Sequence, residues 1–469
     1  MIQPAKEILR NTLLTGIAAI VVLAATAAPA AEVPVWDGAW SGQTAVLVQE
    51  TAGFDRTGEP VEAEITFSQP LRGGGFGAIE DDIRHELRVL HYSGGTFREL
   101  PCQAYDIRYA GKNNPPAQAP KSVLVRMRVV FFADVAANST ETYAVCYNNA
   151  TAPEPRYATD LTVSGSGVGF TVDTGKLKIT TETASGQIDQ IDLHFATTPS
   201  FRFKYGTLHW NPDFIVVPDD FPVTNYTWWY AHHFKEPETA IARGPVFFSV
   251  RRKQLIPGQD TAYMEVYYRF YAGQPYFIME SYIEAKKDTR TFAIRNDELA
   301  FGRTDFTHAG WRIKTPDMFD DHLGEIGSIT IYHEERTGGH VLGSALPPNM
   351  AWISLTHPAN GYGVGSIRLE WENVNALTGA PSPLYNSHTV ISEHDEGLYW
   401  FRSLIYSPRG VTGKTSDEAR KNLVKVPKGS SYREKNAYLF YEYGAETKYA
   451  PVDGLWEQLR KPLAVTIVR

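Results

Sequence analysis

The strongest constraint on the fold is the alternation of apolar and polar side chains along most of the chain. It is clear across residues 44–67, as in VEAEITF at 61–67, and again in LVRMRVVFF at 124–132. Successive side chains of a strand point to opposite faces, so a two-residue period indicates half-buried strands. Helical periodicity is convincing only near 415–424 and 453–460. The sequence therefore predicts an all-β protein.

Composition agrees with this fold class and excludes others. The 469 residues include 10 Trp, 25 Tyr and 23 Phe among 38 Gly and 29 Pro, a mixture typical of strands joined by tight turns. The length exceeds one ordinary domain. Lys and Arg total 45 against 53 for Asp and Glu, a net charge of −8 without a basic block. This balance disfavours a nucleic-acid-binding protein.

The first 30 residues have the pattern of a secretory signal peptide. Lys6 and Arg10 precede an apolar run over 13–28, and Ala28-Pro29-Ala30 supplies the small residues of a cleavage site. An uncleaved N-terminal anchor is the alternative. No other stretch is apolar for long enough to span a bilayer. We expect a secreted or periplasmic protein that has no membrane association once residues 1–30 are removed.

The two cysteines, Cys102 and Cys146, both lie in the first third of the chain. An even cysteine count in an exported protein predicts one disulfide that closes this region. The alternative is a pair of buried free thiols.

A turn-rich segment divides the chain into two parts. Residues 148–160 (NNATAPEPRYATD) are rich in turn formers and prolines. We expect residues 31–160 to form a β-sandwich of roughly immunoglobulin size. Residues 161–469 are predicted to be mostly antiparallel strands. So many strands bury their apolar faces most economically as two large stacked sheets, a β-supersandwich.

Two segments carry a resemblance to known families. Residues 53–61 (GFDRTGEPV) resemble the opening of secreted polysaccharide-degrading proteins of the exo-rhamnogalacturonan lyase type. The run from Tyr157 through 171–174 (TVDT) to 185–188 (SGQI) is similar to the entry into a galactose-mutarotase-like supersandwich. The resemblance implies that fold for residues 161–469, and a carbohydrate substrate. Related lyases often carry a helical toroid, for which this chain has no room, so no catalytic residue is transferred from them.

The densest group of polar and aromatic residues is NYTWWYAHH at 225–233, soon followed by Arg243. Aromatic faces stack on sugar rings, while His, Tyr and Arg bond to hydroxyls and carboxylates. Similar residues occur upstream at 209–213 and downstream at 386–402. The expected substrate-binding residues are Trp228, Trp229, Tyr226, His209, Trp210, Asn296, His388 and Tyr399.

These residue types fit a polysaccharide lyase that cleaves a uronic-acid-containing glycan by β-elimination. Such an enzyme needs a base at C5, an acid at the leaving oxygen and a cation that neutralises the carboxylate. We expect His233 or His232 as the base and Tyr230 as the acid. Arg243 and Arg402 are the expected neutralisers.

Two other functions remain open at this stage. The first is a glycoside hydrolase or other carbohydrate-active enzyme, of which a glycoside hydrolase would need two carboxylates about 5–10 Å apart. The candidates are Glu236, Glu238, Asp297, Glu298, Asp305, Glu393 and Glu396. A non-catalytic glycan-binding protein would need only the aromatic residues. The expected partner is a polysaccharide or oligosaccharide. No cofactor is expected, and a calcium ion held by scattered carboxylates is the open alternative.

Overall fold

The structure is a computed structural model. It describes residues 33–72, 75–116, 120–195, 201–202, 213–216, 227–255, 261–316, 321–331, 350–382, 389–394, 397–406, 417–418 and 421–468. The predicted signal peptide, residues 1–30, lies outside these ranges. Within them, no helix has the length and apolar character needed to cross a membrane.

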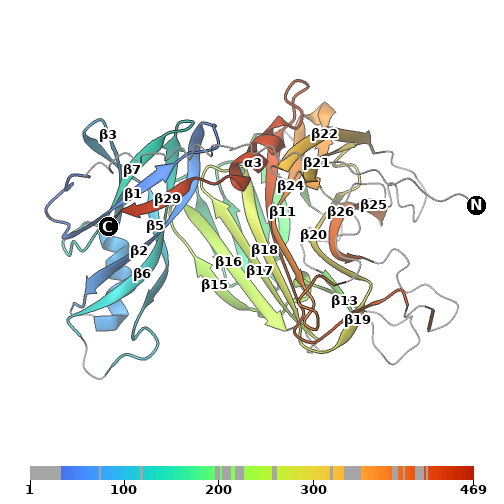
Figure 1. The fold of residues 1–469 in the computed structure, drawn as a ribbon, viewed down its shortest axis with the longest axis horizontal. Helices are drawn as coiled ribbons and strands as arrows, with labels where there is room; N and C mark the ends of the chain where they lie inside the picture. The colour runs from blue at the N-terminus through green and yellow to red at the C-terminus, as the bar shows by residue number, and fades with distance from the viewer. Residues whose placement is uncertain are drawn as a thin grey trace, which may run out of the picture.

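The first domain is a sandwich of two antiparallel sheets (Figure 1). The larger sheet has the strand order β29-β1-β7-β3-β4 and the smaller has the order β2-β6-β5. The bounds are β1 (Gly42–Gln49), β2 (Arg56–Pro70), β3 (Arg88–Ser93), β4 (Thr96–Leu100), β5 (Cys102–Tyr109), β6 (Ser122–Val135), β7 (Thr140–Tyr147) and β29 (Ala464–Val468).

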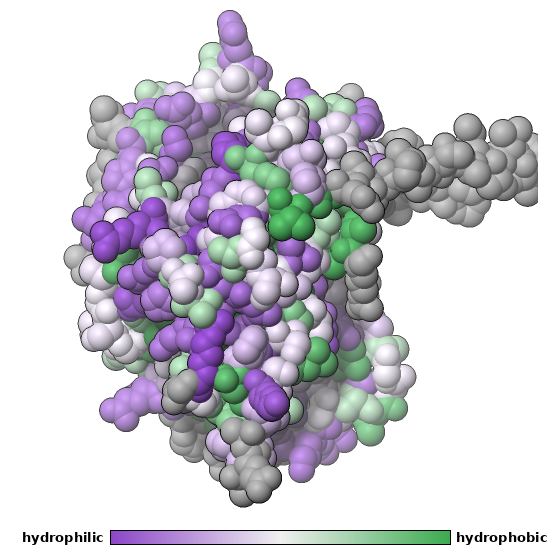
Figure 2. Space-filling view, turned by 90° about the vertical axis from the view of Figure 1, so that its left-hand side faces the viewer, coloured by the Kyte–Doolittle hydropathy of each residue, from purple (hydrophilic) through white to green (hydrophobic). Residues whose placement is uncertain are grey.

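Side-chain alternation builds the core of this sandwich. Val61 and Ile65 of β2 and Met127 of β6 point inward, with at most 3% of each exposed. The intervening positions face outward, as the two-residue period predicts. The short helices η1 (Gly75–Ala78) and α1 (Ile79–Glu86) close one end, where Ile79 and Ile83 enter the core. Figure 2 views the molecule from the left-hand side of Figure 1, where the first sandwich lies, and most of this face is hydrophilic.

The C-terminal strand belongs to the first sandwich. β29 runs antiparallel to β1, with Ala45 opposite Val468 and Gln49 opposite Ala464. The chain therefore returns to its starting sheet after completing the second domain. The sequence-based range of the second domain, 161–469, includes β29, which the structure places in the first sandwich, whose predicted range was 31–160.

The second domain is built on a nine-stranded antiparallel sheet. Its strand order is β15-β16-β17-β18-β28-β24-β23-β21-β22. The bounds are β15 (Glu238–Ala242), β16 (Phe247–Leu255), β17 (Ala262–Tyr271), β18 (Tyr276–Ala285), β21 (His308–Pro316), β22 (Asp321–Thr330), β23 (Met350–His357), β24 (Tyr362–Val374) and β28 (Ser431–Glu442).

Two five-stranded sheets and a two-stranded one complete this domain. One has the order β12-β11-β10-β9-β8, and the other, which we call the site sheet, has the order β14-β13-β20-β26-β25. The bounds are β8 (Thr162–Ser166), β9 (Gly169–Asp173), β10 (Leu177–Thr181), β11 (Ile188–Leu193), β12 (Phe201–Arg202), β13 (Asp213–Val216), β14 (Thr227–Tyr230), β19 (Thr289–Thr291), β20 (Ala293–Gly302), β25 (Thr389–His394), β26 (Gly397–Tyr406) and β27 (Val424–Val426).

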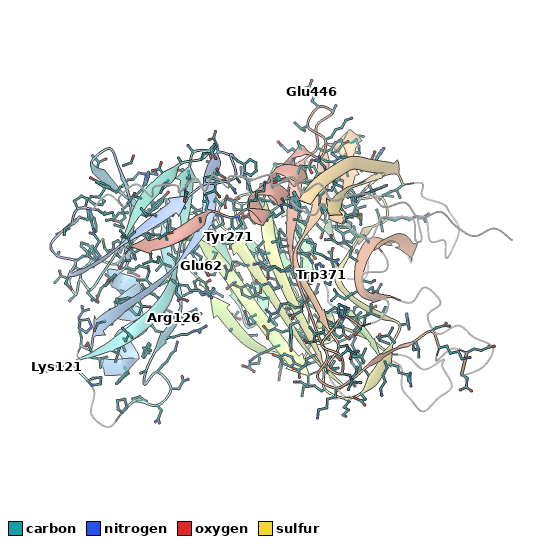
Figure 3. All side chains as sticks on the ribbon, in the orientation of Figure 1. Glu62, Lys121, Arg126, Tyr271, Trp371 and Glu446 are labelled. Carbon is teal, nitrogen blue, oxygen red and sulfur yellow. The ribbon has the colours of Figure 1, made fainter. Side chains whose placement is uncertain are left out.

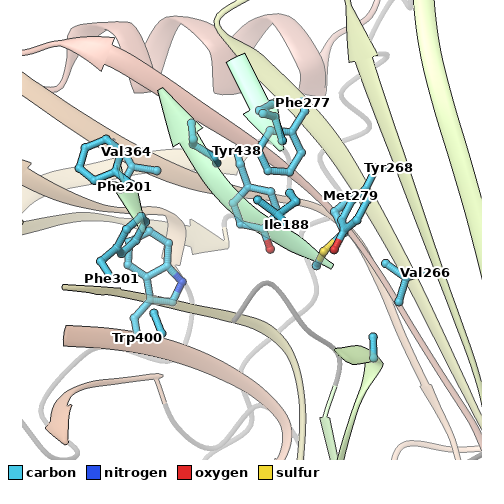
Figure 4. Packing of buried hydrophobic residues seen from close by; sticks show 14 of the residues in the cluster. Ile188, Phe201, Val266, Tyr268, Phe277, Met279, Phe301, Val364, Trp400 and Tyr438 are labelled. Carbon is cyan, nitrogen blue, oxygen red and sulfur yellow. The ribbon is translucent and has the colours of Figure 1, made fainter. Parts of the chain in front are cut away.

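A single apolar core joins the nine-stranded sheet to both five-stranded sheets (Figure 4). Phe277 and Tyr438 enter it from the nine-stranded sheet, Ile188 from β11, and Phe301 and Trp400 from the site sheet. All five side chains are completely buried. This arrangement confirms the all-β architecture of a β-sandwich followed by a large antiparallel supersandwich.

The opposite face of the nine-stranded sheet is also covered. Helix α3 (Ala450–Arg460) packs on it through Val452 and Trp456, beside Trp352 of β23. This helix confirms the helical periodicity expected at 453–460. The range 415–424 is described only in part, and its last residue begins β27.

An arginine joins the two domains. Arg269 of β17 forms an ion pair with Glu62 of β2 at 3.2 Å and donates a hydrogen bond to the Tyr105 hydroxyl at 3.1 Å. It also contacts the Tyr271 hydroxyl at 3.3 Å. Glu62 and Tyr271, which both contact Arg269, lie where the two domains meet (Figure 3).

The predicted disulfide is wrong, because both cysteines are free and buried. Cys102 lies in the core between the two sheets of the first sandwich. Cys146 points to the other side of β7, where it packs with Leu90, Ala144 and nearby tryptophans. The two thiols occupy different apolar clusters, so an S–S bond does not form between them. Burial raises the pKa of Cys102 to about 11 and that of Cys146 to about 12.

Candidate functional site

The site sheet brings together residues that are far apart in the sequence. Strand β14 carries Trp228, Trp229 and Tyr230, β20 carries Asn296, and β26 carries Tyr399 and Arg402. The short helix η2 (Ala231–His233) follows β14 directly and carries His232 and His233. Most of the predicted site residues that the structure describes therefore lie on one sheet or at its edge.

Strand register gives the spacing of these positions. Tyr230 lies opposite Asp213, Asp213 opposite Arg295, and Arg295 opposite Ser403. Neighbouring strands are about 4.8 Å apart, so this row extends about 14 Å from Tyr230 to Ser403. Arg402 is opposite Asp297, beyond a register shift in β20.

Trp229, Tyr230, His232 and His233 form a compact group that we call the histidine–aromatic cluster. The Tyr230 and His232 rings are stacked with centroids 4.9 Å apart, and the two imidazoles are 4.1 Å apart. Trp229 meets His233 edge-on at 5.7 Å. The Tyr230 backbone N–H donates to His233 Nδ1 at 3.1 Å. With Nδ1 accepting, a neutral His233 carries its proton on Nε2.

The local sequence explains why these imidazoles are presented at the surface. Ala231 and Phe234 are completely or almost completely buried in the main core of the second domain. They anchor the two ends of η2, while His232 and His233 between them stay half-buried. A half-buried imidazole can both contact a ligand and exchange protons with it. Trp229 packs against the core, so its ring also supports the cluster from below.

Arg402 lies in the interior of the domain, where it does not fit the predicted role of neutralising a substrate carboxylate. It is 1% exposed, and its Nε is 2.5 Å from Asp297 Oδ2. Its Nη2 donates to the Ser366 hydroxyl at 2.8 Å. Tyr438 donates to the other oxygen of Asp297 at 2.8 Å. Burial favours the neutral form of Asp297, but Arg402 and Arg368 outweigh it and lower the pKa of this carboxyl.

A second buried carboxylate, Glu434 of β28, lies in the same region. It accepts a hydrogen bond from Arg368 Nε at 2.8 Å and one from the Asn436 amide at 3.1 Å. Burial raises the pKa of Glu434, which Arg368 only partly offsets. Sequence reasoning missed this residue. The available signal was the polar Glu434 and Asn436 at inward-facing positions between Tyr432 and Tyr438.

Arg243 lies apart from the histidine–aromatic cluster. Strand β15 separates it from η2, and a five-residue strand spans about 17 Å. The guanidinium of Arg243 lies over the rings of Phe170 and Phe248, and it donates to the Gly165 carbonyl at 3.2 Å. The structure therefore does not unite the predicted base with either predicted neutraliser.

Four predicted substrate-binding residues, Tyr226, His209, Trp210 and His388, lie outside the described residues. For Trp228, Asn296 and Tyr399 the structure gives the strand position only. Their predicted role in substrate binding stays a prediction.

Of the carboxylates considered for hydrolysis, the structure describes the side chains of Asp297, Glu236, Glu238 and Asp305. It gives Glu298 and Glu393 a strand position only, and Glu396 lies outside the described residues. Asp297 is buried against Arg402, while Glu236 and Glu238 are exposed. Asp305 follows the far end of β20, and burial raises its pKa to about 6. Gly302, where β20 ends, is about 23 Å along the strand from Arg295. Among the described residues, no three His, Cys, Asp or Glu side chains are grouped to hold a metal ion.

Comparisons with known proteins show similarity in fold. The sequence matches no protein-family model, and no curated protein matches it significantly. An α-mannosidase from Enterococcus faecalis V583 is 12% identical, with a TM-score of 0.52 over 91% of this chain and 46% of that chain. A protein of glycosyl hydrolase family 38 from Enterococcus faecalis is also 12% identical, with a TM-score of 0.50 over 91% of this chain and 47% of that chain. The chain thus spans less than half the length of both proteins.

A galactose mutarotase related enzyme from Lactobacillus acidophilus is 8% identical, with a TM-score of 0.34 over 61% of this chain and 98% of that chain. None of these three proteins is described as a rhamnogalacturonan lyase, so that part of the resemblance stays a prediction.

Proposed function

We propose that this protein is a carbohydrate-active enzyme that transfers protons at a glycan bound to the histidine–aromatic cluster. The observation that carries the proposal is the contact of two half-buried imidazoles with Tyr230 and Trp229 at the edge of the site sheet. The fold similarity to an α-mannosidase and a family 38 glycosyl hydrolase supports a glycan as substrate. The pattern of residues 1–30 supports action outside the cytoplasm.

The cluster has the chemistry that proton transfer at a sugar requires. Histidine changes its charge near neutral pH and serves as acid or base toward hydroxyl and ring oxygens. The hydrogen bond at Nδ1 leaves Nε2 of a neutral His233 as a donor. The stacked ring of His232 on Tyr230 provides a flat surface of the kind on which sugars pack.

This geometry favours hydrolysis or another acid–base reaction over β-elimination. A lyase needs a cation next to the uronate carboxylate while the base attacks C5. Arg402 is held in the core by Asp297, and Arg243 lies beyond β15. Neither is placed to serve the histidines.

The second candidate function is glycan binding without catalysis. The positions of the described carboxylates favour this function. Asp297 is buried, Glu236 and Glu238 are exposed, and Asp305 is distant from the cluster. A binding protein would need the rings of the cluster but no pair of carboxylates.

A substrate screen tests the proposal. The purified protein is incubated with α-mannosides, other neutral glycans and uronate polysaccharides, while reducing ends, optical rotation and absorbance near 235 nm are recorded. We expect new reducing ends or a change in optical rotation on one glycan. The His232→Ala/His233→Ala variant is expected to lose about 100-fold or more of this activity. His194→Ala, which removes an exposed histidine elsewhere, serves as the control.

Each other outcome has a defined meaning. Turnover that is unchanged in the double variant would overturn the assignment of the site. Retention on a glycan column without turnover would establish the binding function instead. Absorbance that rises at 235 nm would show β-elimination, and neither turnover nor retention on any glycan would refute the proposal.

A further inference from the structure

We infer that the cleft between the two domains is a second glycan site, which binds an acidic saccharide through Arg156 and Arg243. This inference does not depend on the proposed function, because the cleft and the histidine–aromatic cluster are separate places on the molecule.

Both domains contribute residues to the walls of the cleft. It has a volume of about 530 Å³. From the first domain it is lined by the end of α1, the start of β5 and residues 154–159, and from the second by residues 243–245. Strand β15, which leads into 243–245, is the edge of the large sheet on the side of the first sandwich (Figure 1). Ligand sites commonly lie at such domain boundaries.

Among the charged residues of the lining, cations outnumber anions. Arg84, Arg156 and Arg243 face the cleft, and Glu154 is the carboxylate among its lining residues. Arg84 is paired with Glu80 and Asp81. Within the described part of the chain, neither Arg156 nor Arg243 forms an ion pair with a carboxylate, and both are exposed. Two unpaired guanidiniums on one cleft are notable in a chain whose net charge is −8.

Arg243 is held in a fixed position. Its guanidinium centre lies 5.3 Å from the Phe170 ring and 5.6 Å from the Phe248 ring. The bond from Nη2 to the Gly165 carbonyl uses one of its five N–H donors. The remaining donors are available to a ligand, and the pre-set position reduces the entropy that binding would cost.

A buried amide, Gln103, fixes the shape of the cleft wall. Gln103 is 5% exposed, and its Oε1 accepts the Phe247 backbone N–H at 3.0 Å. That bond fixes the side-chain orientation, while Nε2 is fully buried and has no hydrogen-bond partner among the described residues. Gly244 is needed here, because a Cβ at this position would lie 2.3 Å from Gln103 Cδ.

An adjoining hollow extends the same surface. It has a volume of about 770 Å³, and Arg84 and Arg243 line it as well. It adds the rings of Tyr105 and Tyr109 together with Arg108 and Lys112. Arg108 pairs with Asp106 and Lys112 with Glu80, so these two cations are already compensated. The unpaired charge is therefore concentrated at Arg156 and Arg243, with aromatic faces alongside.

The chemistry of these groups selects an anionic saccharide. Guanidiniums are donors that match carboxylate or sulfate oxygens. Tyrosine rings provide faces for sugar rings. A neutral sugar would leave both arginines without a countercharge. The shared ligand chemistry is thus a saccharide that carries carboxylates or sulfate esters.

Binding measurements on the full protein test the inference. An oligouronate trimer, a sulfated oligosaccharide and maltotriose are titrated by calorimetry at low and at raised salt. We expect one of the acidic probes to bind and maltotriose to bind at least about tenfold more weakly. Raised salt should lower the affinity for the acidic probe. The acidic probe that binds identifies carboxylate or sulfate as the recognised group.

Variants locate the site. The Arg156→Ala/Arg243→Ala variant is expected to lower the affinity for the acidic probe at least about tenfold. The control Arg98→Ala, which removes an exposed arginine of β4, should leave this affinity unchanged. Thermal unfolding of both variants verifies that the fold is intact. The His232→Ala/His233→Ala variant should retain the acidic ligand, which separates this inference from the proposed function. Equal binding of maltotriose, no binding of either acidic probe, or unchanged affinity in the double arginine variant would overturn it.

Discussion

At the residue scale, the interior of the second domain depends on charges that have been removed from water. Asp297 and Arg402 are 0% and 1% exposed, and they compensate each other at 2.5 Å. Ser366 and Tyr438 donate to the same carboxylate at 2.9 and 2.8 Å. A buried ion pair is tolerated when further hydrogen bonds satisfy its carboxylate in this way, and loss of one partner leaves the other charge uncompensated. Among the described residues, Nη1 of Arg402 has no hydrogen-bond partner of its own.

Asp297→Asn should therefore destabilise the second domain by about 3–5 kcal/mol, because Arg402 would remain buried without a countercharge. Chemical denaturation followed by tryptophan fluorescence measures this change. The control is Glu64→Gln, which removes an exposed partner of Arg126 and should cost at most about 1 kcal/mol. If both variants unfold alike, the buried network does not stabilise the domain.

The buried carboxyl group of Asp305 should make the free energy of unfolding depend on pH. Burial raises the pKa of Asp305 to about 6 from 3.8, so between these values the folded protein holds a proton that the unfolded chain releases. The contribution of this group to stability therefore falls as pH rises from about 4 to about 6. Between pH 4.5 and 7, the wild type should lose about 1–2 kcal/mol more than Asp305→Asn. Parallel pH profiles from denaturant unfolding that coincide for the two proteins would contradict this.

At the scale of elements, the C-terminal strand completes the sheet in which the described chain begins. Five residue pairs join β29 to β1, and Leu463 just before β29 enters the core of the first sandwich. An unpaired β1 would present an open edge to solvent.

Deletion of residues 464–469 should lower the melting temperature of the first sandwich by several degrees and promote aggregation. Hydrogen exchange measured by mass spectrometry should increase at β1 and leave β17 unchanged. Exchange at β1 that equals the full-length protein would show that β29 is dispensable.

The elements that the sequence predicted well are those with a strict period. In β2 and β6, inward positions such as Ile65 and Met127 alternate with polar residues, and the pattern alone identifies the strand. The pairing of β29 with β1 was beyond this reasoning, since it links positions more than 400 residues apart. A short alternating run does not specify which sheet it joins.

At the scale of the whole molecule, the junction between the domains centres on Arg269. Its side chain is 17% exposed, and it contacts Glu62 and Tyr105 from the first domain and Tyr271 from the second. Arg251 on the neighbouring strand β16 is 46% exposed and pairs with Glu265. Arg251 is therefore a suitable control for Arg269, because it lies on the neighbouring strand but at the surface and not at the junction.

Arg269→Met should weaken docking of the domains by about 2 kcal/mol, because Glu62 would lose a largely buried countercharge. We expect the thermal transition to broaden or split, and exchange to increase along β2 and β5. Arg251→Met should leave the transition unchanged. A single unaltered transition in both variants would mean that other contacts hold the domains together.

The candidate site was predictable in residue type but only partly in position. The run at 225–233 identified Tyr230, His232 and His233, which the structure places in contact. Arg402 has the same residue type as a substrate-binding cation, yet it is buried against Asp297. Sequence alone does not distinguish these cases, because burial of a charge depends on a partner from another strand. The same limit applies to Arg243, which β15 places in the interdomain cleft.

The central claim is that a glycan binds at His232 and His233. It is tested most directly by NMR of protein labelled with ¹⁵N at histidine, titrated with the glycan that the substrate screen selects. The account predicts that the imidazole signals of His232 and His233, assigned by single substitutions, shift together with one dissociation constant. The signals of His91 and His194, which pair with Glu141 and Asp173, should stay in place. Saturable glycan binding that leaves the two cluster signals unmoved would contradict the account.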